Sequence, residues 1–254
     1  KFNGEGELTY DNGDNYKGNF LNDNYHGYGL KKWSDGNSWN GEWLHGLPHG
    51  EGTFKYKNGT IYIGSMKFNS FEGQGSMEFP DGVRYEGQFK NDQYNGKGIL
   101  TTVGEGGYIF EGNFKDGLKE GFGTESYYDG TKYEGQFKND RYNGDGIQIW
   151  ANGGGYEGNF IDNIKNGLGT IFWINGTYAI GQFKNNMLNG FGDYWEDLGH
   201  YSGTFKDNQR DGQGIYKSNN GSYYKGSYKN NEYNGYGELF WPDGSTYSGE
   251  FKDG

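Results

Sequence analysis

The sequence has no cysteine among its 254 residues, few aliphatic side chains and no excess of basic residues. The absence of cysteine excludes disulfides and thiolate chemistry, and it fits a reducing compartment. The net charge of −11 argues against nucleic acid as the main ligand, because binding to phosphates needs a basic face. No apolar run approaches the roughly 20 residues that a membrane-spanning helix needs, and no signal-peptide core is visible.

What the sequence does contain is aromatic side chains, at 19% of all residues, and 51 glycines. A hydrophobic fraction of 31% is too small for a thick globular core, whereas aromatic residues are depleted in disordered chains. The composition therefore predicts a thin structure whose buried side consists of rings and glycines. Because the chain opens at Lys1 without an initiator methionine, we expect it to be an excerpt of a longer polypeptide.

An aromatic-x-Gly-x-aromatic frame recurs along the chain, as in "YEGQF" at Tyr85 and again at Tyr133. Successive frames are 23 residues apart, except for steps of 25 and 22 residues that end at Phe110 and Tyr201. The second glycine of a Gly-x-Gly pair follows 13 residues after each frame begins. Such a fixed period indicates a repeat architecture.

Each half of the repeat reads as a short strand, because alternate residues of a strand share one face. Tyr85, Gly87 and Phe89 then lie on one face, and Gly96 and Gly98 lie on the same face of the next strand. The position four residues after the second glycine shares this face and usually holds a ring, namely Trp33, Tyr56, Phe79, Tyr127, Trp150, Trp173 or Trp241. We expect the rings to lie flat over glycine Cα atoms of neighbouring strands.

Two kinds of connection alternate in this pattern. Asn-Gly and Asp-Gly pairs such as Asp81-Gly82 supply the positive φ of a tight hairpin turn, and segments such as "KNDQYN" read as solvated loops. The predicted fold is all-β: an elongated, single-layer antiparallel meander of stacked β-hairpins, with about ten to eleven 23-residue repeats. We expect a twisted, gutter-shaped rod.

These motifs resemble the MORN repeat, and the resemblance covers the whole chain. Residues 1–15 read as a partial repeat, 16–246 as full repeats and 247–254 as a further partial repeat of one array. Two units depart from the pattern, because Ala179 replaces the first aromatic of one frame and Met66 replaces the second aromatic of another. The Ala179 unit leaves the local register open, since Tyr178 lies one residue early.

The resemblance implies an elongated array that binds proteins. MORN proteins organise cytoskeletal, ciliary and cortical assemblies or target attached enzyme domains, and phospholipid binding and self-association have been ascribed to the repeats. We therefore expect a cytoplasmic, cytoskeleton- or cilium-associated scaffold, with homodimer formation as a further expectation. The alternative is a phospholipid-binding module that targets an enzyme domain outside this sequence to a membrane.

Catalytic chemistry has no candidate in the sequence. His26 and His49 hold the same repeat position, which is asparagine in several other units, and they read as polar turn residues rather than metal ligands. The recurrent glutamates at Glu86 and Glu134 would lie about 10 Å or more apart on the polar face, too far to share a proton. We expect no enzyme, no metal and no cofactor.

The aromatic face is the candidate interaction site, because one sheet cannot cover every ring and exposed aromatic grooves bind partners. The expected partner is a protein segment, either an amphipathic helix or an extended strand. The residues expected in this groove are Tyr85, Phe89, Tyr133, Phe137, Trp150, Tyr156, Phe160 and Trp173. Under the phospholipid alternative, the lysines that follow the frames would contact anionic lipid, namely Lys90, Lys115, Lys138 and Lys184.

Overall fold

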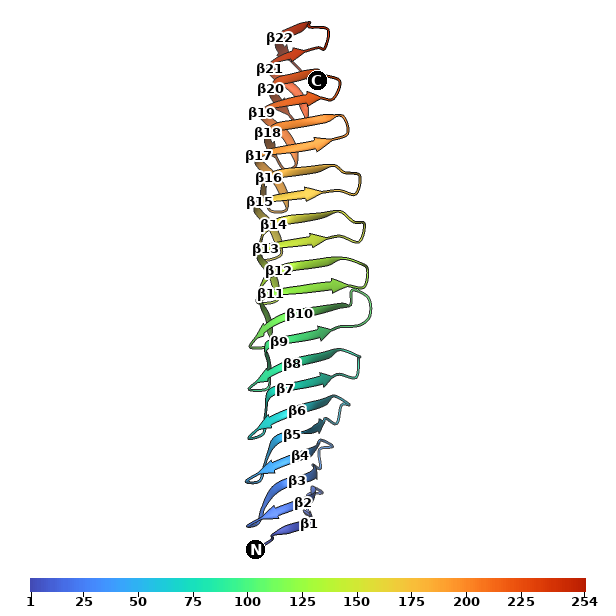
Figure 1. Cartoon of the computed structure of the whole chain (residues 1–254), viewed down its shortest axis with the longest axis vertical. Helices are drawn as coiled ribbons and strands as arrows, with labels where there is room; N and C mark the ends of the chain where they lie inside the picture. The colour runs from blue at the N-terminus through green and yellow to red at the C-terminus, as the bar shows by residue number, and fades with distance from the viewer. The chain divides into compact units, whose positions relative to one another are not determined.

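The computed structural model describes all residues from 1 to 254, and the chain consists of strands and turns (Figure 1). It divides into two compact units, Lys1–Tyr128 and Asp129–Gly254. The strands of the first unit are β1 (Gly4–Thr9), β2 (Asn15–Leu21), β3 (Asn24–Lys32), β4 (Ser38–Leu44), β5 (Leu47–Lys55), β6 (Ile61–Lys67), β7 (Ser70–Glu78), β8 (Arg84–Lys90), β9 (Gln93–Thr101), β10 (Tyr108–Lys115) and β11 (Leu118–Tyr127).

The second unit repeats this arrangement. Its strands are β12 (Lys132–Lys138), β13 (Arg141–Ile149), β14 (Gly155–Ile161), β15 (Ile164–Phe172), β16 (Tyr178–Lys184), β17 (Met187–Glu196), β18 (Gly199–Lys206), β19 (Gln209–Ser218), β20 (Tyr223–Lys229), β21 (Glu232–Phe240) and β22 (Thr246–Phe251). Within each unit every strand pairs antiparallel with the next strand along the chain. The predicted all-β meander of single-layer hairpins is therefore confirmed in each unit.

The tight turns lie elsewhere than the sequence analysis predicted. Asn91 and Asp92 alone join β8 to β9, with φ of 48° and 65°, so the segment expected to be a solvated loop is the two-residue hairpin turn. Left-handed φ at both central residues is the geometry that matches the twist of flanking strands, and Asn and Asp tolerate it. The Asp81-Gly82 pair sits instead in a five-residue connection between β7 and β8, where only Gly82 has a positive φ.

These tight turns also bind the preceding hairpin. The backbone N–H of Phe71 donates to Oδ1 of Asp92 at 2.7 Å, and the backbone N–H of Asp92 donates to the carbonyl of Phe71 at 3.2 Å. Tyr142 and Asn163 form the same pair of bonds in the second unit, at 2.7 and 2.9 Å. The Asn and Asp residues of the turns thus connect each hairpin to its predecessor, and they are more than a solvated segment.

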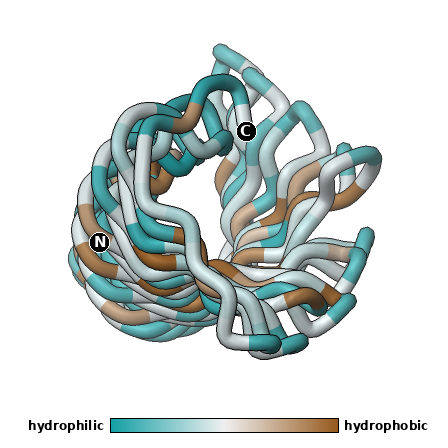
Figure 2. The backbone as a smooth tube through the Cα atoms, turned by 90° about the horizontal axis from the view of Figure 1, so that it is seen from above, coloured by the Kyte–Doolittle hydropathy of each residue, from teal (hydrophilic) through white to brown (hydrophobic).

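A bulge recurs in the hairpins and corrects the predicted role of the first glycine in Gly-x-Gly. The register passes from Gly87 opposite Gly98 to Phe89 opposite Tyr94. Gln88 of β8 therefore lies opposite three residues of β9, at positions 95–97. Gly96, within the bulge, has φ of 68°, which a residue with a Cβ rarely adopts. A side chain there would meet the Gln88 side chain rather than a ring. Bulges bend a strand, and the strands are visibly curved in Figure 2.

The ring that covers the glycines comes from the same hairpin, not from a neighbouring one. A Cβ added to Gly87 or Gly98 would lie 2.6 or 2.4 Å from the hydroxyl oxygen of Tyr85. That hydroxyl donates at 2.8 Å to the carbonyl of Gln88, the residue that the bulge leaves without a partner in β9. A backbone carbonyl without a partner in the ladder needs another donor, so the ring, the bulge and the glycine pair form one structural unit.

A third ring, not predicted from the sequence, stacks on the frame ring in five hairpins, at Tyr25, Phe71, Tyr94, Tyr142 and Tyr233. Tyr94 stacks on Tyr85 with ring centroids 3.7 Å apart, and Phe89 packs edge-on against Tyr85 at 5.1 Å. Tyr133 and Tyr142 stack in the same way at 3.6 Å. Because this ring follows the tight turn by two residues, its position could be found only once that turn was correctly placed.

Candidate functional site

Most of the rings expected to line a groove are buried. Tyr85, Phe89, Tyr133, Phe137, Tyr156 and Phe160 have between 0 and 3% of their surface exposed. They pack on the glycines of their own hairpin and on one another, so they cannot touch a partner directly. This corrects the expectation for these six residues. We call the face of the sheet that carries them the ring face.

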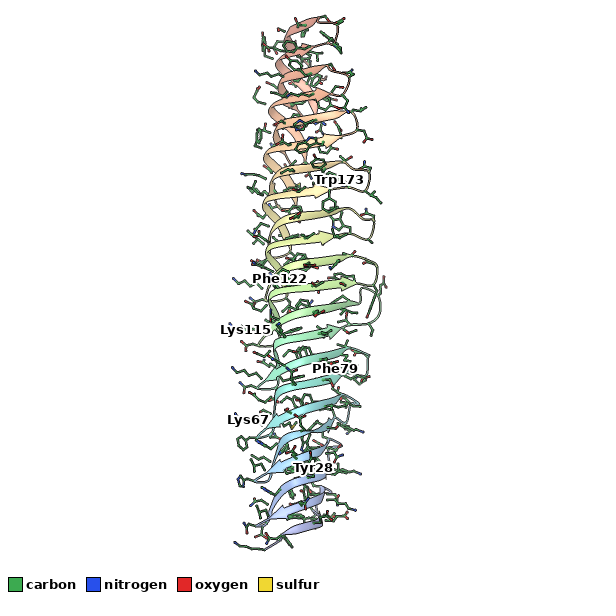
Figure 3. The ribbon with its side chains drawn as sticks, in the orientation of Figure 1. Tyr28, Lys67, Phe79, Lys115, Phe122 and Trp173 are labelled. Carbon is green, nitrogen blue, oxygen red and sulfur yellow. The ribbon has the colours of Figure 1, made fainter.

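The two remaining candidates, Trp150 and Trp173, lie at the start of the wider turns. The ammonium group of Lys165 lies 4.6 Å from the centre of the Trp150 ring and covers it. Trp173 is 39% exposed and packs edge-on towards Tyr194 at 6.2 Å (Figure 3). Trp173 is therefore the predicted residue that the structure leaves available to a partner.

The Ala179 hairpin keeps the register of the other hairpins. Gly181 faces Gly192 and Ala179 faces Tyr194, which settles the register that the sequence left open. Tyr178 points to the opposite face, where it stacks on Trp195 with centroids 4.5 Å apart. The position of the frame ring is thus occupied by a methyl group only.

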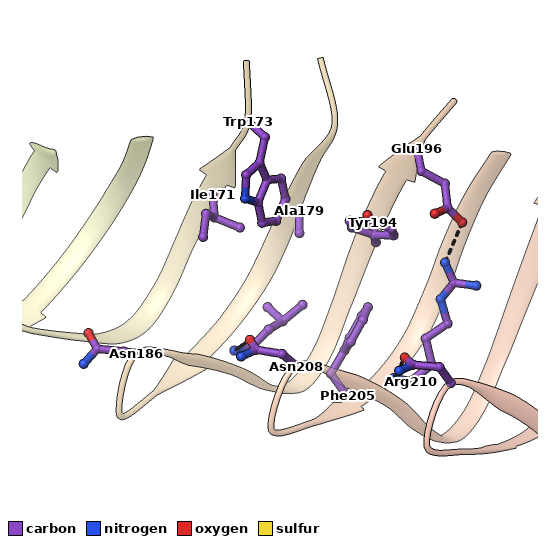
Figure 4. A pocket seen from close by; sticks show the side chains of 11 residues that line it. Ile171, Trp173, Ala179, Asn186, Tyr194, Glu196, Phe205, Asn208 and Arg210 are labelled. Atoms are coloured by element: carbon purple, nitrogen blue, oxygen red, sulfur yellow. Dashed lines mark hydrogen bonds and ion pairs between the residues drawn. The ribbon is translucent and has the colours of Figure 1, made fainter. Parts of the chain in front are cut away.

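A cavity of about 630 Å³ lies on the ring face at this place, entirely within the second unit (Figure 4). We call it the ring-face cavity. Its volume falls within the range of about 300–1,000 Å³ that is typical of ligand sites. Strands β15 to β19 and the neighbouring tight turns supply its lining, which consists of Ile171, Trp173, Ala179, Asn186, Leu188, Tyr194, Glu196, Phe205, Asn208, Arg210 and Asn231.

Polar groups border the apolar centre of the cavity. Arg210 donates to Glu196 at 2.6 Å, as the dashed line in Figure 4 marks, and its guanidinium lies 5.1 Å from the ring of Tyr201. Oδ1 of Asn208 accepts the N–H of Leu188 at 2.7 Å, and the amide nitrogen of Asn208 donates to no group of the chain. The edge of the cavity can therefore hydrogen-bond a ligand while its centre holds an apolar group.

The phenols around the cavity stay protonated at physiological pH. Burial, reinforced by the Glu196 carboxylate, raises the pKa of Tyr194, although Arg210 acts in the opposite direction. Burial also raises the pKa of Tyr201 to about 12. The site thus offers neutral rings and one charge-paired arginine, and it contains no group with the properties of a nucleophile or general base.

A second cavity of about 430 Å³ lies on the ring face of the first unit, where Met66 stands in place of the second frame aromatic. Asp35, Asn37, Asn69 and Asp92 give it a more polar lining than the first. Both cavities therefore occur where a repeat departs from its own pattern. Both substitutions are visible in the sequence but predict no site, because a missing ring becomes a cavity only if its neighbours hold their places.

The predicted lipid-contact residues Lys90, Lys115, Lys138 and Lys184 are all exposed, at the strand ends that precede the tight turns. Figure 3 shows Lys67 and Lys115 projecting from this edge of the first unit. Each lysine is followed by Asn or Asp in the turn, so the edge carries mixed charge. No helix is long and apolar enough to cross a membrane, and no cluster of three metal-ligating side chains is present.

Three solved structures that match the chain have low sequence identity and low TM-scores. One match is the TCP domain of SAS-4 from Drosophila melanogaster, which was solved in complex with a proline-rich motif of Ana2. The alignment covers 97% of this chain and 90% of that domain's chain, with 9% identity and a TM-score of 0.23. The alignment with a streptogramin B lyase covers 99% of this chain and 84% of the lyase chain, with 12% identity and a TM-score of 0.16. The alignment with virginiamycin B lyase from Staphylococcus aureus covers 98% of this chain and 85% of the lyase chain, with 10% identity and a TM-score of 0.16. No curated protein matches the sequence significantly.

The family comparison agrees with the hairpin unit of the structure. The MORN repeat model matches eleven segments, namely residues 1–15, 16–38, 39–61, 62–84, 85–103, 110–132, 133–155, 156–178, 180–198, 201–223 and 224–246. The shortened matches stop in the connections that follow β9 and β17, where the repeat length changes. The chain belongs to the MORN-repeat family.

Proposed function

We propose that this chain is a non-catalytic scaffold that holds a protein segment along its ring face. MORN repeats are modules that bind partners or membranes, and the family is generally non-catalytic. The observation that supports a protein ligand most directly is the ring-face cavity, which combines an exposed tryptophan, buried apolar walls and hydrogen-bonding groups at its edge. Aromatic anchors in such pockets dominate the binding energy of protein interfaces.

A membrane is the less favoured ligand. The lysines of the turn edge alternate with carboxylates and amides, so an anionic surface would meet repulsion as well as attraction. Each lysine near an anionic membrane contributes only about 1 kcal/mol. The assembly that the scaffold serves is proposed to be cytoplasmic and cytoskeletal or ciliary, as membership of the MORN family suggests, and a homodimer is part of the same proposal.

The proposal is tested by selecting binding peptides from a displayed library and measuring their affinity for two tryptophan variants. Trp173→Ala should weaken binding about 30-fold, because loss of an interface tryptophan typically costs about 2 kcal/mol or more. Trp241→Ala is the matched control, since Trp241 holds the same repeat position and is 42% exposed but precedes β22, whose frame ring Tyr247 is in place. Equal effects of the two variants would contradict the ring-face cavity as the binding site.

Sedimentation with vesicles of phosphatidylserine and phosphatidylcholine distinguishes a membrane-binding module from a scaffold for protein segments. A scaffold for protein segments should not sediment with the vesicles at low salt. Salt-sensitive sedimentation that is lost on replacing Lys90, Lys115, Lys138 and Lys184 by glutamate would favour the lipid function. Light scattering of the protein without vesicles measures its oligomeric state.

A further inference from the structure

We propose that the ring-face cavity binds a tyrosine side chain of the partner segment, which takes the place of the frame ring that Ala179 lacks. The inference rests on the proposed function for the existence of such a segment, and it adds the chemistry of the anchoring residue. It follows from what the ring does in the two hairpins on either side.

In those neighbouring hairpins the frame tyrosine has two tasks. It covers the glycine pair, and its hydroxyl donates to the backbone carbonyl three residues later. Tyr156 donates to Asn159 at 3.2 Å, and Tyr201 donates to Thr204 at 2.9 Å. Eight frame tyrosines make this bond, and the indole N–H of Trp39 makes it to Glu42 at 3.1 Å.

The Ala179 hairpin retains the acceptor but lacks the side-chain donor that serves it in the other hairpins. The register passes from Gly181 opposite Gly192 to Phe183 opposite Leu188, so Gln182 lacks a partner in β17 as its counterparts do in their hairpins. A methyl group cannot donate to the Gln182 carbonyl. A phenol that enters the cavity from a partner can donate to it.

The glycine pair of this hairpin, Gly181 and Gly192, is also retained, although no ring of the same hairpin covers it. A Cβ added to Gly214 would lie 2.4 Å from the hydroxyl oxygen of Tyr201, whereas the nearest side-chain atom to a Cβ on Gly192 is Cδ2 of Phe205 at 3.4 Å. Glycine within a strand marks a place where another group approaches the backbone closely. In this hairpin Leu188 covers Gly181, since its Cδ1 atom would lie 2.9 Å from a Cβ on that glycine, whereas Gly192 remains open to a planar group.

The walls favour an aromatic occupant. Trp173 and Tyr194 lie on one side of the cavity and Phe205 on the other, in the close view of Figure 4. Rings pair favourably edge-to-face or offset, beyond the effect of their buried area. An engineered apolar cavity of only about 150 Å³ in another protein binds benzene, and the ring-face cavity is larger at about 630 Å³.

The direct test uses the side chains themselves as probes: p-cresol for tyrosine and toluene for phenylalanine, with binding followed by NMR of the indole N–H groups. The unmodified chain should bind p-cresol about threefold to tenfold more tightly than toluene, which is the ratio that one hydrogen bond provides. Ala179→Tyr should fill the cavity from within, weaken p-cresol binding at least tenfold and raise the melting temperature. Ala179→Leu is the smaller filler if the tyrosine variant does not fold.

Ile180→Thr is the matched control, since it changes the adjacent residue of β16 on the opposite, exposed face and should leave p-cresol binding unchanged. Absence of p-cresol binding at millimolar concentration, or binding that survives both fillers, would overturn the proposal. So would equal affinity for toluene, because the carbonyl of Gln182 would then have no role.

Peptides from the displayed library distinguish this inference from the proposed function. If both hold, replacing the peptide tyrosine by alanine weakens binding at least tenfold to the unmodified chain but not to Ala179→Tyr. Peptides that bind without any tyrosine dependence would overturn the inference and leave the scaffold function standing. If no peptide binds, the scaffold function is contradicted. The p-cresol measurement then still tests whether the ring-face cavity binds a phenol.

Discussion

The packing of a ring on paired glycines predicts that two chemically identical substitutions have very different effects. Gly146→Ala would place a methyl group 2.4 Å from the hydroxyl oxygen and 2.6 Å from Cζ of Tyr133, a fully buried ring. At Gly192, in the hairpin without a frame ring, the nearest atom is the Ile180 carbonyl oxygen at 3.0 Å. Neither glycine has a positive φ, so backbone strain is not involved.

The expected loss of stability in Gly146→Ala follows from the displacement of the Tyr133 ring. Overpacking a close-packed core costs about 1–3 kcal/mol. Displacement of the ring also weakens its 3.0 Å hydrogen bond to the Gln136 carbonyl, worth about 0.5–1.5 kcal/mol. Alanine in place of glycine within a strand recovers about 0.5–1 kcal/mol of chain entropy. We expect Gly146→Ala to cost about 2–3 kcal/mol, and Gly192→Ala to stay within about 1 kcal/mol of the unmodified chain.

Urea unfolding followed by tryptophan fluorescence, together with thermal melts, measures both variants. For a chain of this size about 1 kcal/mol shifts the melting temperature by about 2–4 °C, so Gly146→Ala should melt about 4–12 °C lower and Gly192→Ala nearly unchanged. Equal losses at the two sites would refute the claim that the ring, rather than the backbone of the sheet, requires glycine.

Three further predictions concern the turns and the phenols. Phe68 occupies a tight turn with φ of 48° and is 52% exposed, so Phe68→Asn should stabilise the chain by about 0.5–1 kcal/mol in thermal melts; a lower melting temperature would show that the ring has a packing role. Asn163→Ala removes the 2.7 Å bond to the Tyr142 N–H and should cost about 1–2 kcal/mol, whereas Asn163→Asp, which retains an acceptor, should cost less than half as much. Burial raises the pKa of Tyr16 and Tyr201 from 10 to about 12, so the folded state holds these protons more tightly than the unfolded state. Stability should accordingly be constant with respect to these groups below pH 10 and fall as the pH rises towards 12, with phenolate absorbance appearing at the unfolding transition; phenolate formation in a chain that remains folded would contradict this.

The strand pattern and the class of fold could be predicted from the sequence because period-2 alternation and a fixed repeat length are local properties. The frame of Tyr85, Gly87 and Phe89 shares a face as expected. The turn assignment was wrong because Asn-Gly and Asn-Asp can both adopt positive φ, and only the pairing register decides which connection has two residues. The same error hid the bulge at Gly96 and the stacked ring of Tyr94.

The candidate site could be predicted only in part, for a different reason. Composition indicates that a single sheet must leave some rings exposed, but it does not indicate which ones. Tyr156 and Trp173 look equally suited to a groove in the sequence, yet the first is fully buried and the second is 39% exposed. Tyr156 lies over its glycine pair and below the ammonium group of Lys165 at 5.3 Å, whereas Trp173 lies in the turn after β15. Those are contacts between segments that sequence periodicity does not describe.

The repeat architecture itself explains why cavities form on the ring face at its irregular units. In a regular hairpin the ring covers the glycines, its hydroxyl satisfies the bulged carbonyl, and the stacked residue covers the ring, so no group is left for a ligand. Replacing that ring by Ala179 removes the cover and the donor together, while the register of β16 and β17 remains that of their neighbours. The flanking hairpins prevent the strands from collapsing into the vacancy. A repeat protein can thus form a specific site by one substitution, because the surrounding units keep the shape of the missing side chain.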